Sequence, residues 1–470
     1  MKNLNRFLAV AVLAMAVGTV EAQNVSPVDF MRNNSKALYA NPATFTPDNF
    51  YFDFALGNVN SGFQNTGLKY DNFFDFDANG YPVLLNINKG ISKMERTNYL
   101  NLDFSSDVFS LGFRTKHGFV TYSHRFRAFE SLTYSKDLLQ LVVGGNASFL
   151  GQDNPANLNI GLSTRAYQDF SLGWQMCLTE KLDFGVRLKF LMGFADAQAD
   201  INAKLYTNPE TYALRLTAGA DGRTSLPFDF FTEDGEINYN AINGFNYKRL
   251  FNNFGGGIDL GAEYRINDQW GIAAAVNDLG WISWNNSSSH FVASLKDGGS
   301  LYHDGGIEFE GLTEEQINGM MDDPNYLSQL TDSLIGYVGF DVTTASYSSM
   351  LNTSAMVRGY FDLTPNNRFS AQLLGYYTGS GIKPAATLAY TGSFINRYDV
   401  VIMYTVMPGS YDNIGIGLSA NFGVIQLFVA SNNIIGFFNP LNSSQLNFQF
   451  GISFTSLKKR DRDEMVVIRE

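Results

Sequence analysis

The sequence predicts an all-β fold, a transmembrane antiparallel β-barrel of about 14 strands. Three observations predict this class. The composition is poor in charge and rich in glycine and aromatic residues, long segments alternate apolar with polar side chains, and tight joints alternate with long ones along the chain. Together they favour strands that cross a membrane over the strands of a soluble domain.

The composition alone excludes several classes of protein. Only 17% of the 470 residues are charged, the formal net charge is -12, and the chain holds 44 Gly, 40 Phe and 24 Tyr. Soluble globular domains average about 25% charged residues, and these residue types are typical of strands. The lone Cys177 excludes a disulfide framework and a Cys-based zinc site. The acidic balance argues against a nucleic-acid partner.

Residues 1–22 have the pattern of a secretory signal peptide. Lys2 and Arg6 precede an apolar stretch from Phe7 to Val20, and Ala22 offers a small residue for cleavage. The stretch is shorter than the roughly 20 residues that a helix needs to span a bilayer, so an uncleaved anchor is the weaker alternative. No apolar run of transmembrane-helix length follows, and a mature membrane protein must then be a barrel.

Alternation is complete in the last predicted strand. From Gln445 to Phe454 every even position is apolar and every odd position is polar or small, and from Lys181 to Phe194 only Leu191 breaks the same pattern. The strands of soluble sandwiches also alternate, but they are usually about 5 to 6 residues long. Segments of about ten or more residues match tilted strands that cross hydrocarbon, with apolar side chains outside and polar ones inside.

Strand ranges follow from this alternation and from the joints between segments. We predict strands at 50–60, 97–115, 117–127, 165–178, 181–206, 254–266, 270–284, 349–362, 368–378, 383–393, 397–407, 411–421, 424–431 and 445–455. Tight joints at one rim and long ones at the other (61–96, 128–164, 207–253, 285–348 and 432–444) are the outer-membrane pattern, with the tight side and both mature termini periplasmic. Counts of 12 and 16 stay open, because 97–115 also fits two strands and Tyr212–Thr217 fits a hairpin above the membrane.

The segment before the first strand contains a short motif that is similar to one in a known protein family. Asn41-Pro42-Ala43 stands shortly before the strand that begins near Phe50. It resembles the N-terminal region of long-chain fatty-acid transporter-type outer-membrane barrels, whose fold is a 14-stranded barrel with a plug, and the layout is similar to an uncharacterised barrel family from Bacteroidota. The resemblance implies a plug at 23–48 with Asn41, Pro42 and Ala43 as its motif. The residue patterns themselves predict a signal peptide at 1–22, a barrel at 49–456 and a charged periplasmic tail at 457–470, and this tail departs from the aromatic ending that is common in such barrels.

Charged residues on the inward face of the predicted strands are the candidate lumen residues. They are Asp183, Arg187, Lys189, Asp259, Glu263 and Arg265. One interpretation is a network of ion pairs and water that fills the lumen, and the other is a permeation path. The sequence does not decide between them.

The sequence gives little support to a catalytic site or a metal site. His117 and His124 lie seven apart on one predicted strand and so on opposite faces, and no Gly-x-Ser-x-Gly motif occurs. Asp75 to Gly80 matches the first half of a calcium loop, but the twelfth position is Asn86 instead of the bidentate Glu. We expect no catalytic residue, no metal and no cofactor. Thr313 to Gln316 fits a helix-capping box in a small cap over the mouth.

The leading functional hypothesis is passive uptake of a hydrophobic or amphipathic small molecule through a plugged lumen. This rests on the resemblance and on a barrel wide enough to need a plug. We expect a monomer in the outer membrane of a Gram-negative bacterium, with outer-membrane lipid and a hydrophobic small-molecule ligand as its partners. The alternatives are a non-catalytic platform for a secretion or surface complex and, third, an enzyme that acts on lipids.

Overall fold

The computed structural model describes most of the chain, and every statement below concerns these residues. They are residues 25–44, 50–78, 81–151, 153–211, 213–232, 237–238, 240–285, 288–297, 300–302, 307–309, 338–377, 382–395 and 397–457. The predicted signal peptide at 1–22, the predicted helix at Thr313–Gln316 and the predicted tail beyond Leu457 lie outside them.

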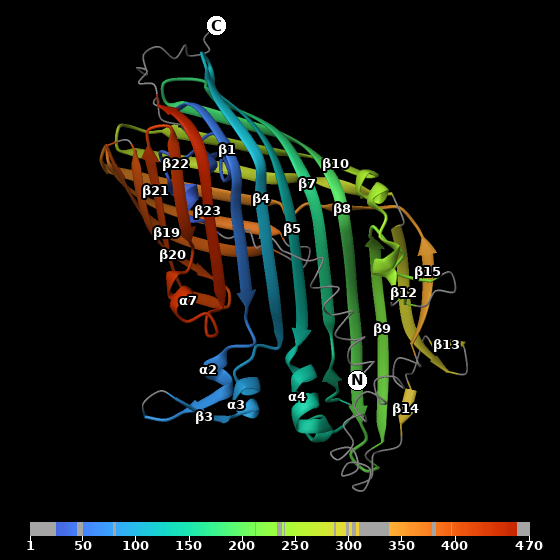
Figure 1. Ribbon diagram of the computed structural model, residues 1–470. Helices are drawn as coiled ribbons and strands as arrows, with labels where there is room; N and C mark the ends of the chain where they lie inside the picture. Colours follow the sequence, from blue (N-terminus) through green and yellow to red (C-terminus); the bar gives the residue numbers. More distant parts are fainter. Residues whose placement is uncertain are drawn as a thin grey trace.

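Fourteen of the described strands form a closed antiparallel ring (Figure 1). In order around the wall they are β1 (Phe50–Asn65), β4 (Thr97–Thr115), β5 (Gly118–Ser135), β7 (Ile160–Cys177), β8 (Leu182–Thr207), β10 (Asn253–Arg265), β11 (Trp270–Trp284), β17 (Ser354–Thr364), β18 (Asn367–Tyr377), β19 (Ile382–Phe394), β20 (Tyr398–Met407), β21 (Ser410–Phe422), β22 (Ile425–Ser431) and β23 (Gln445–Leu457). The pairing of β1 with β23, with Phe54 opposite Phe454, closes the ring. The predicted barrel of 14 strands is confirmed.

The two faces of the wall differ as the alternation predicts. On β8, Leu188 and Phe190 are 57% and 50% exposed on the outer face, whereas Asp183 and Arg187 are buried on the inner face. Leu191, which breaks the alternation, is also inward and fully buried. The exposed side is therefore apolar and the buried side polar, the reverse of a water-soluble protein.

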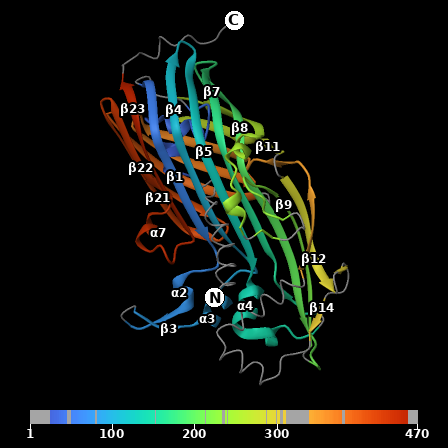
Figure 2. The same cartoon turned by 45° about the vertical axis from the view of Figure 1, so that its right-hand side comes forward.

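The two rims of the barrel are unequal. Tight turns join β4 to β5, β7 to β8 and β21 to β22 at one end, which we call the turn rim, and the long connections lie at the other end, the loop rim. Figure 2 shows that the loop rim extends further on the side of β8 and β9 than on the side of β21 and β22. The lengths of β8 (26 residues) and β22 (7 residues) produce this slope. Among the described helices, none is long and apolar enough to cross a membrane.

The loop rim carries short elements. They are α2 (Tyr70–Phe73), β2 (Phe74–Phe76), β3 (Pro82–Leu85), α3 (Ile87–Ser92), α4 (Lys136–Gly144), η3 (Gly145–Ser148), β6 (Ala156–Asn157), β9 (Leu214–Ser225), η4 (Ala241–Gly244), η5 (Tyr247–Phe251), β12 (Ser288–Asp297), β13 (Ser300–Tyr302), β14 (Ile307–Phe309), β15 (Val338–Thr344), β16 (Tyr347–Met350) and α7 (Ile434–Phe438). β9 pairs with the outer part of β8, which confirms the hairpin extension suggested by Tyr212–Thr217.

Several predicted strand ranges differ from the structure, because β1 ends at Asn65 instead of 60, β7 begins at Ile160 instead of 165, and two further ranges differ more. β5 continues to Ser135, beyond the predicted end at 127, and hydrogen bonds to β4 and β7 hold this extension although its sequence stops alternating. The predicted strand 349–362 is divided into β16 and β17. The break lies opposite Asp278, whose φ of 58° marks an irregularity within the continuous strand β11. An irregular residue on one strand thus interrupts the pairing of its neighbour.

Candidate functional site

The N-terminal segment, which we define as residues 25–44, lies inside the barrel in the half nearer the turn rim. It contains two short 3-10 helices, η1 (Pro27–Phe30) and η2 (Ser35–Tyr39). Ser26 caps η1, and its backbone N–H donates to Asp29 Oδ2 at 2.9 Å. Asn34 Oδ1 accepts from Lys36 N at 3.0 Å and caps η2. Side-chain caps let helices this short form, because they satisfy backbone donors that have no partner within the helix.

The predicted motif Asn41-Pro42-Ala43 ends the segment against the wall. Asn41 Oδ1 accepts from Ala43 N at 2.9 Å, which folds the three residues into a turn. A Cβ at Gly185 of β8 would overlap the Pro42 carbonyl, and one at Gly261 of β10 would overlap Asn41 Oδ1. The motif therefore fits a recess that two wall glycines create.

The helix η1 packs against an apolar part of the wall. Met31 and Phe30 are 1% and 4% exposed. Their cluster comprises Val25, Val28, Phe30, Met31, Ala385, Ala389, Val401, Met403, Met407, Phe428 and Ala430, so the wall side comes from β19, β20 and β22. Arg358 of β17 lies over the Phe30 ring at 4.2 Å and donates to the Asp29 carbonyl at 2.8 Å.

The helix η2 makes ionic contacts with the opposite part of the wall. Lys36 Nζ lies 3.5 Å from Asp53 of β1 and 3.6 Å from Asp107 of β4. Burial lowers the pKa of Lys36, but the charges of Asp53 and Asp107 outweigh burial and hold that pKa above its ordinary value. Lys36 is therefore a buried cation held by two carboxylates.

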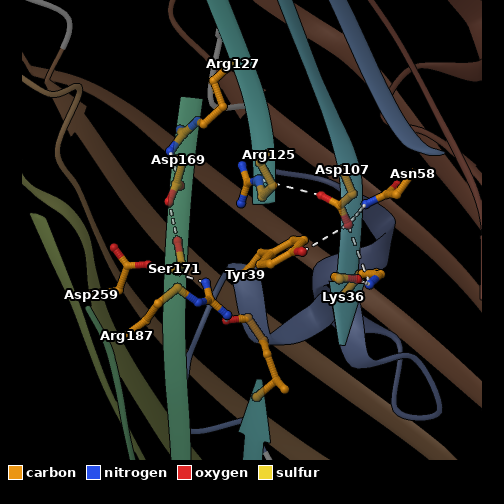
Figure 3. A network of polar contacts seen from close by, with 12 residues as sticks. Lys36, Tyr39, Asn58, Asp107, Arg125, Arg127, Asp169, Ser171, Arg187 and Asp259 are labelled. Carbon is orange, nitrogen blue, oxygen red and sulfur yellow. Dashed lines mark hydrogen bonds and ion pairs between the residues drawn. The ribbon is translucent and has the colours of Figure 1, made fainter. Parts of the chain in front are cut away.

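Tyr39 of η2 links the segment to three strands (Figure 3). Its hydroxyl donates to Asp107 at 3.0 Å, and its ring lies between the guanidinium groups of Arg125 of β5 and Arg187 of β8, at 4.3 and 4.8 Å. Burial raises the pKa of Tyr39, so the hydroxyl remains a donor. Arg187 also donates to the Leu38 carbonyl at 2.9 Å.

Three of the six predicted lumen residues join one network. Arg187 and Lys189 lie 3.4 and 2.8 Å from Asp259, and Lys189 also lies 2.6 Å from Asp278. The other three lie nearer the turn rim, where Arg265 pairs with Asp183 at 2.9 Å and Tyr360 donates to Glu263 at 3.0 Å. All six face inward.

The sequence prediction missed several members of this network. Asp278 was not selected as a lumen residue. Regular alternation along β11 places the even-numbered positions, Asp278 among them, on the outer face. The positive φ at Asp278 reverses the alternation, and its carboxylate turns inward to Arg127 at 2.8 Å. Lys36 and Tyr39 precede the first strand, where no alternation exists to reveal their orientation. Arg127 and Asp169 lay in predicted strands but were not selected.

A cavity of about 140 Å³ separates the N-terminal segment from part of this network. Asp29, Lys36 and Tyr39 line it from the segment, and Arg125, Arg127, Lys189, Asp107 and Asp278 are among the wall residues that line it. At about 30 Å³ per molecule, it has room for a few waters.

An apolar layer lies directly beyond the network on the side of the loop rim. It consists of Phe129, Tyr167, Leu191, Ile282, Trp284 and Leu351, all buried. Phe129 and Leu191 are the next inward positions after Arg127 on β5 and Lys189 on β8. On the side of β5, β7, β8 and β11 the lumen is therefore layered, with an apolar layer, then the charged network, then the N-terminal segment, from loop rim to turn rim.

Within the described ranges, no group of three or more His, Cys, Asp or Glu side chains is placed to hold a metal ion. Asp75, the first residue of the calcium-loop match, pairs with Lys89 at 2.7 Å. Asp77 and Tyr81 close a turn, with Tyr81 N donating to Asp77 Oδ1 at 2.9 Å.

A family of unknown function, DUF5723, matches residues 42–432. The chain belongs to this family. The predicted membership of an uncharacterised family is confirmed, whereas an origin in Bacteroidota stays a prediction. The DUF5723 match begins at Pro42, within the N-terminal motif, and covers the wall to the end of β22. No curated protein matches the chain.

Solved structures similar to this DUF5723 chain include two toluene transporters and a FadL homologue. The Pseudomonas putida toluene transporter TodX is 10% identical, with 94% of this chain and 100% of that chain covered and a TM-score of 0.39. The Ralstonia pickettii toluene transporter TbuX is 10% identical, with coverage of 92% and 98% and a TM-score of 0.43. A Pseudomonas aeruginosa FadL homologue is 8% identical, with coverage of 92% and 96% and a TM-score of 0.41.

Proposed function

We propose that this chain is a passive outer-membrane transporter for an amphipathic small molecule, with the N-terminal segment as the plug that closes its lumen. In this proposal the loop rim faces the cell exterior, both mature termini are periplasmic, and the chain acts as a monomer without cofactor or catalytic step. The observation that carries the proposal is the layered lumen.

The layers support an amphipathic molecule over a purely hydrophobic one. The apolar layer that includes Trp284 and Leu191 offers contacts to a hydrocarbon part. The network beyond it pairs five cations, Lys36, Arg125, Arg127, Arg187 and Lys189, with five carboxylates, Asp53, Asp107, Asp169, Asp259 and Asp278. A polar head group can exchange partners with such a balanced network, whereas a hydrocarbon alone would desolvate its charges at a cost of several kcal/mol per ion.

The plug is tested by filling the recess that holds its motif. In Gly185→Val, the new side chain occupies the place of the Pro42 carbonyl and forces residues 41–43 off the wall. We expect a higher conductance of the purified full-length chain in planar bilayers. Gly359→Val of β17 is the matched control, because a Cβ there meets nothing within 4 Å. Equal conductance of the two folded variants would refute the plug.

The ligand class needs a separate measurement. Liposomes that contain the Gly185→Val chain should take up a fluorescent amphiphile with one polar head group faster than a neutral hydrocarbon dye of similar size. Because plug displacement and ligand preference are measured independently, an open barrel without preference would overturn only the amphipathic ligand. Faster uptake of the hydrocarbon would favour a hydrophobic substrate.

A further inference from the structure

Exposed apolar side chains gather on the loop rim in two neighbouring segments. In the connection from β22 to β23, Ile435, Phe437, Phe438 and Leu441 are 44% to 86% exposed. In and around the β2–β3 hairpin, Phe76, Tyr81, Val83, Leu84 and Leu85 are 37% to 69% exposed. We call these nine residues the rim patch. Contiguous exposed apolar surface of this kind marks a site of interaction.

The two halves of the rim patch are fixed to each other. Tyr70 N donates to the Leu441 carbonyl at 3.0 Å, and Asp71 N donates to Asn442 Oδ1 at 2.6 Å. Asn433 Oδ1 caps α7 by accepting from Gly436 N at 3.0 Å. The patch is thus a built surface that joins two connections far apart in the sequence.

The rim patch continues the lipid-facing wall. The ring of Phe437 lies 5.9 Å from that of Phe448 on β23, and Phe448 lies 5.6 Å from Phe450. Phe448, Phe450 and Phe454 are 37% to 44% exposed on the outer face of the barrel. Figure 1 shows α7 beside the loop-rim end of β23 and the β2–β3 hairpin projecting outward from the wall below it. The aromatic contacts therefore connect the exposed outer face of β23 to the α7 half of the rim patch.

We infer that the occupant of the rim patch is membrane lipid, in the head-group and upper acyl region of the leaflet at the loop rim. Apolar and aromatic side chains on short surface elements bind this region by burying apolar area, and Tyr and Trp are enriched at this depth. The Tyr70 ring stacks on Phe74 at 4.4 Å, which places an aromatic pair beside the patch. The patch anchors the low side of the loop rim to the membrane, and this holds whether or not the lumen transports anything.

Nitroxide labels measure the depth of the rim patch directly. In the full chain with Cys177→Ser, a single cysteine is introduced as Phe438→Cys or Leu84→Cys, labelled and placed in phosphatidylcholine nanodiscs. Leu388→Cys is the lipid control, since Leu388 is 63% exposed on the outer face of β19. Asp221→Cys is the water control, because the Asp221 side chain is 72% exposed on β9. All four positions are exposed, so the labels should leave the fold intact.

We measure the accessibility of each label to oxygen divided by its accessibility to a water-soluble nickel complex. We expect this ratio to be lowest at position 221, intermediate at 438 and 84, and highest at 388. Ratios at 438 and 84 equal to that at 221 would overturn the proposal and favour a protein partner in water. A ratio that exceeds that of position 221 at 438 but not at 84 would also overturn it. Hydrogen bonds join the two segments, so both positions should lie at a similar depth.

Discussion

The two helices of the N-terminal segment are held in one lumen by opposite kinds of contact. η1 buries Phe30 and Met31 among apolar side chains of β19, β20 and β22. η2 sets Lys36 and Tyr39 among charged side chains of β1, β4, β5 and β8. Apolar contacts depend on shape and burial, whereas ionic contacts depend on the charge of each partner.

This difference divides the N-terminal segment into η2, which is held mainly by charge, and η1, which is held mainly by apolar packing. A charged ligand can change the energy of η2 directly, whereas on η1 only Asp29 carries a charge. The segment can therefore be loosened on the side of β1 and β8 without being released on the side of β20.

The largest effect is expected for Lys36→Met. Asp53 and Asp107 stay buried after Lys36 is replaced, although Asp107 keeps Arg125 at 3.7 Å, and breaking a buried ion pair costs about 3–5 kcal/mol. The open fraction of the channel in planar bilayers should rise accordingly. Lys36→Met with Asp53→Asn and Asp107→Asn is the control, and it should recover much of the closed state. An unchanged open fraction in Lys36→Met would mean that η1 alone holds the segment.

A somewhat smaller effect is expected for Met31→Ala on the other side. The side chain is fully packed, and truncation of a buried Met to Ala costs about 2–5 kcal/mol. Because no charge changes, the rise in open fraction should be the same at low and high salt. Leu373→Ala, on the 67% exposed outer face of β18, is the matched control. A salt-dependent effect of Met31→Ala would contradict the division.

The wall could be predicted from the sequence, because alternation acts locally. The predicted ranges 97–115 and 270–284 coincide with β4 and β11. On β8 and β10, where the strands stay regular, the charged residues Asp183, Arg187, Lys189, Asp259 and Glu263 are buried. Asp278 was missed because one residue with positive φ reverses every position after it.

The contacts of the segment could not be predicted in the same way. Lys36 meets Asp53 and Asp107 only after the ring closes, and no local pattern pairs residues that far apart. The Asn41 motif was found by resemblance, but its recess depends on Gly185 and Gly261, which the sequence offers among 44 glycines. A glycine in the sequence does not indicate which other residue occupies the space that its missing side chain leaves.

A smaller effect is expected from pH, through Asp29 of η1. Burial raises the pKa of Asp29 to about 6 from an ordinary value of 3.8, against the opposing effects of the Ser26 N–H and the Arg358 charge. A pKa that is raised in the docked state means that docking is strongest below pH 4 and weakens as the pH rises through 6. The loss is about 3 kcal/mol at most, because the carboxylate also lines the cavity, which has room for a few waters.

The open fraction of the channel should therefore increase between pH 4 and pH 7. In Asp29→Asn the side chain stays neutral and isosteric, so this increase should disappear while the closed state at pH 7 is strengthened. A pH dependence that persists in Asp29→Asn would assign it to another group, and the apolar side would then carry no proton-sensitive contact.

The smallest effect is expected for Arg32→Gln, between the two helices. Arg32 lies 3.9 Å from Asp362, with 30% of its side chain exposed, and an ion pair of this kind contributes about 1 kcal/mol or less. Asp362 keeps its two contacts with Arg368, at 2.7 Å each, so no buried charge is left unpaired. The open fraction should stay within a fewfold of that of the unmodified chain. An effect as large as that of Lys36→Met would mean that the segment is fastened at the turn rim, and the contrast between η1 and η2 would then not decide when the lumen opens.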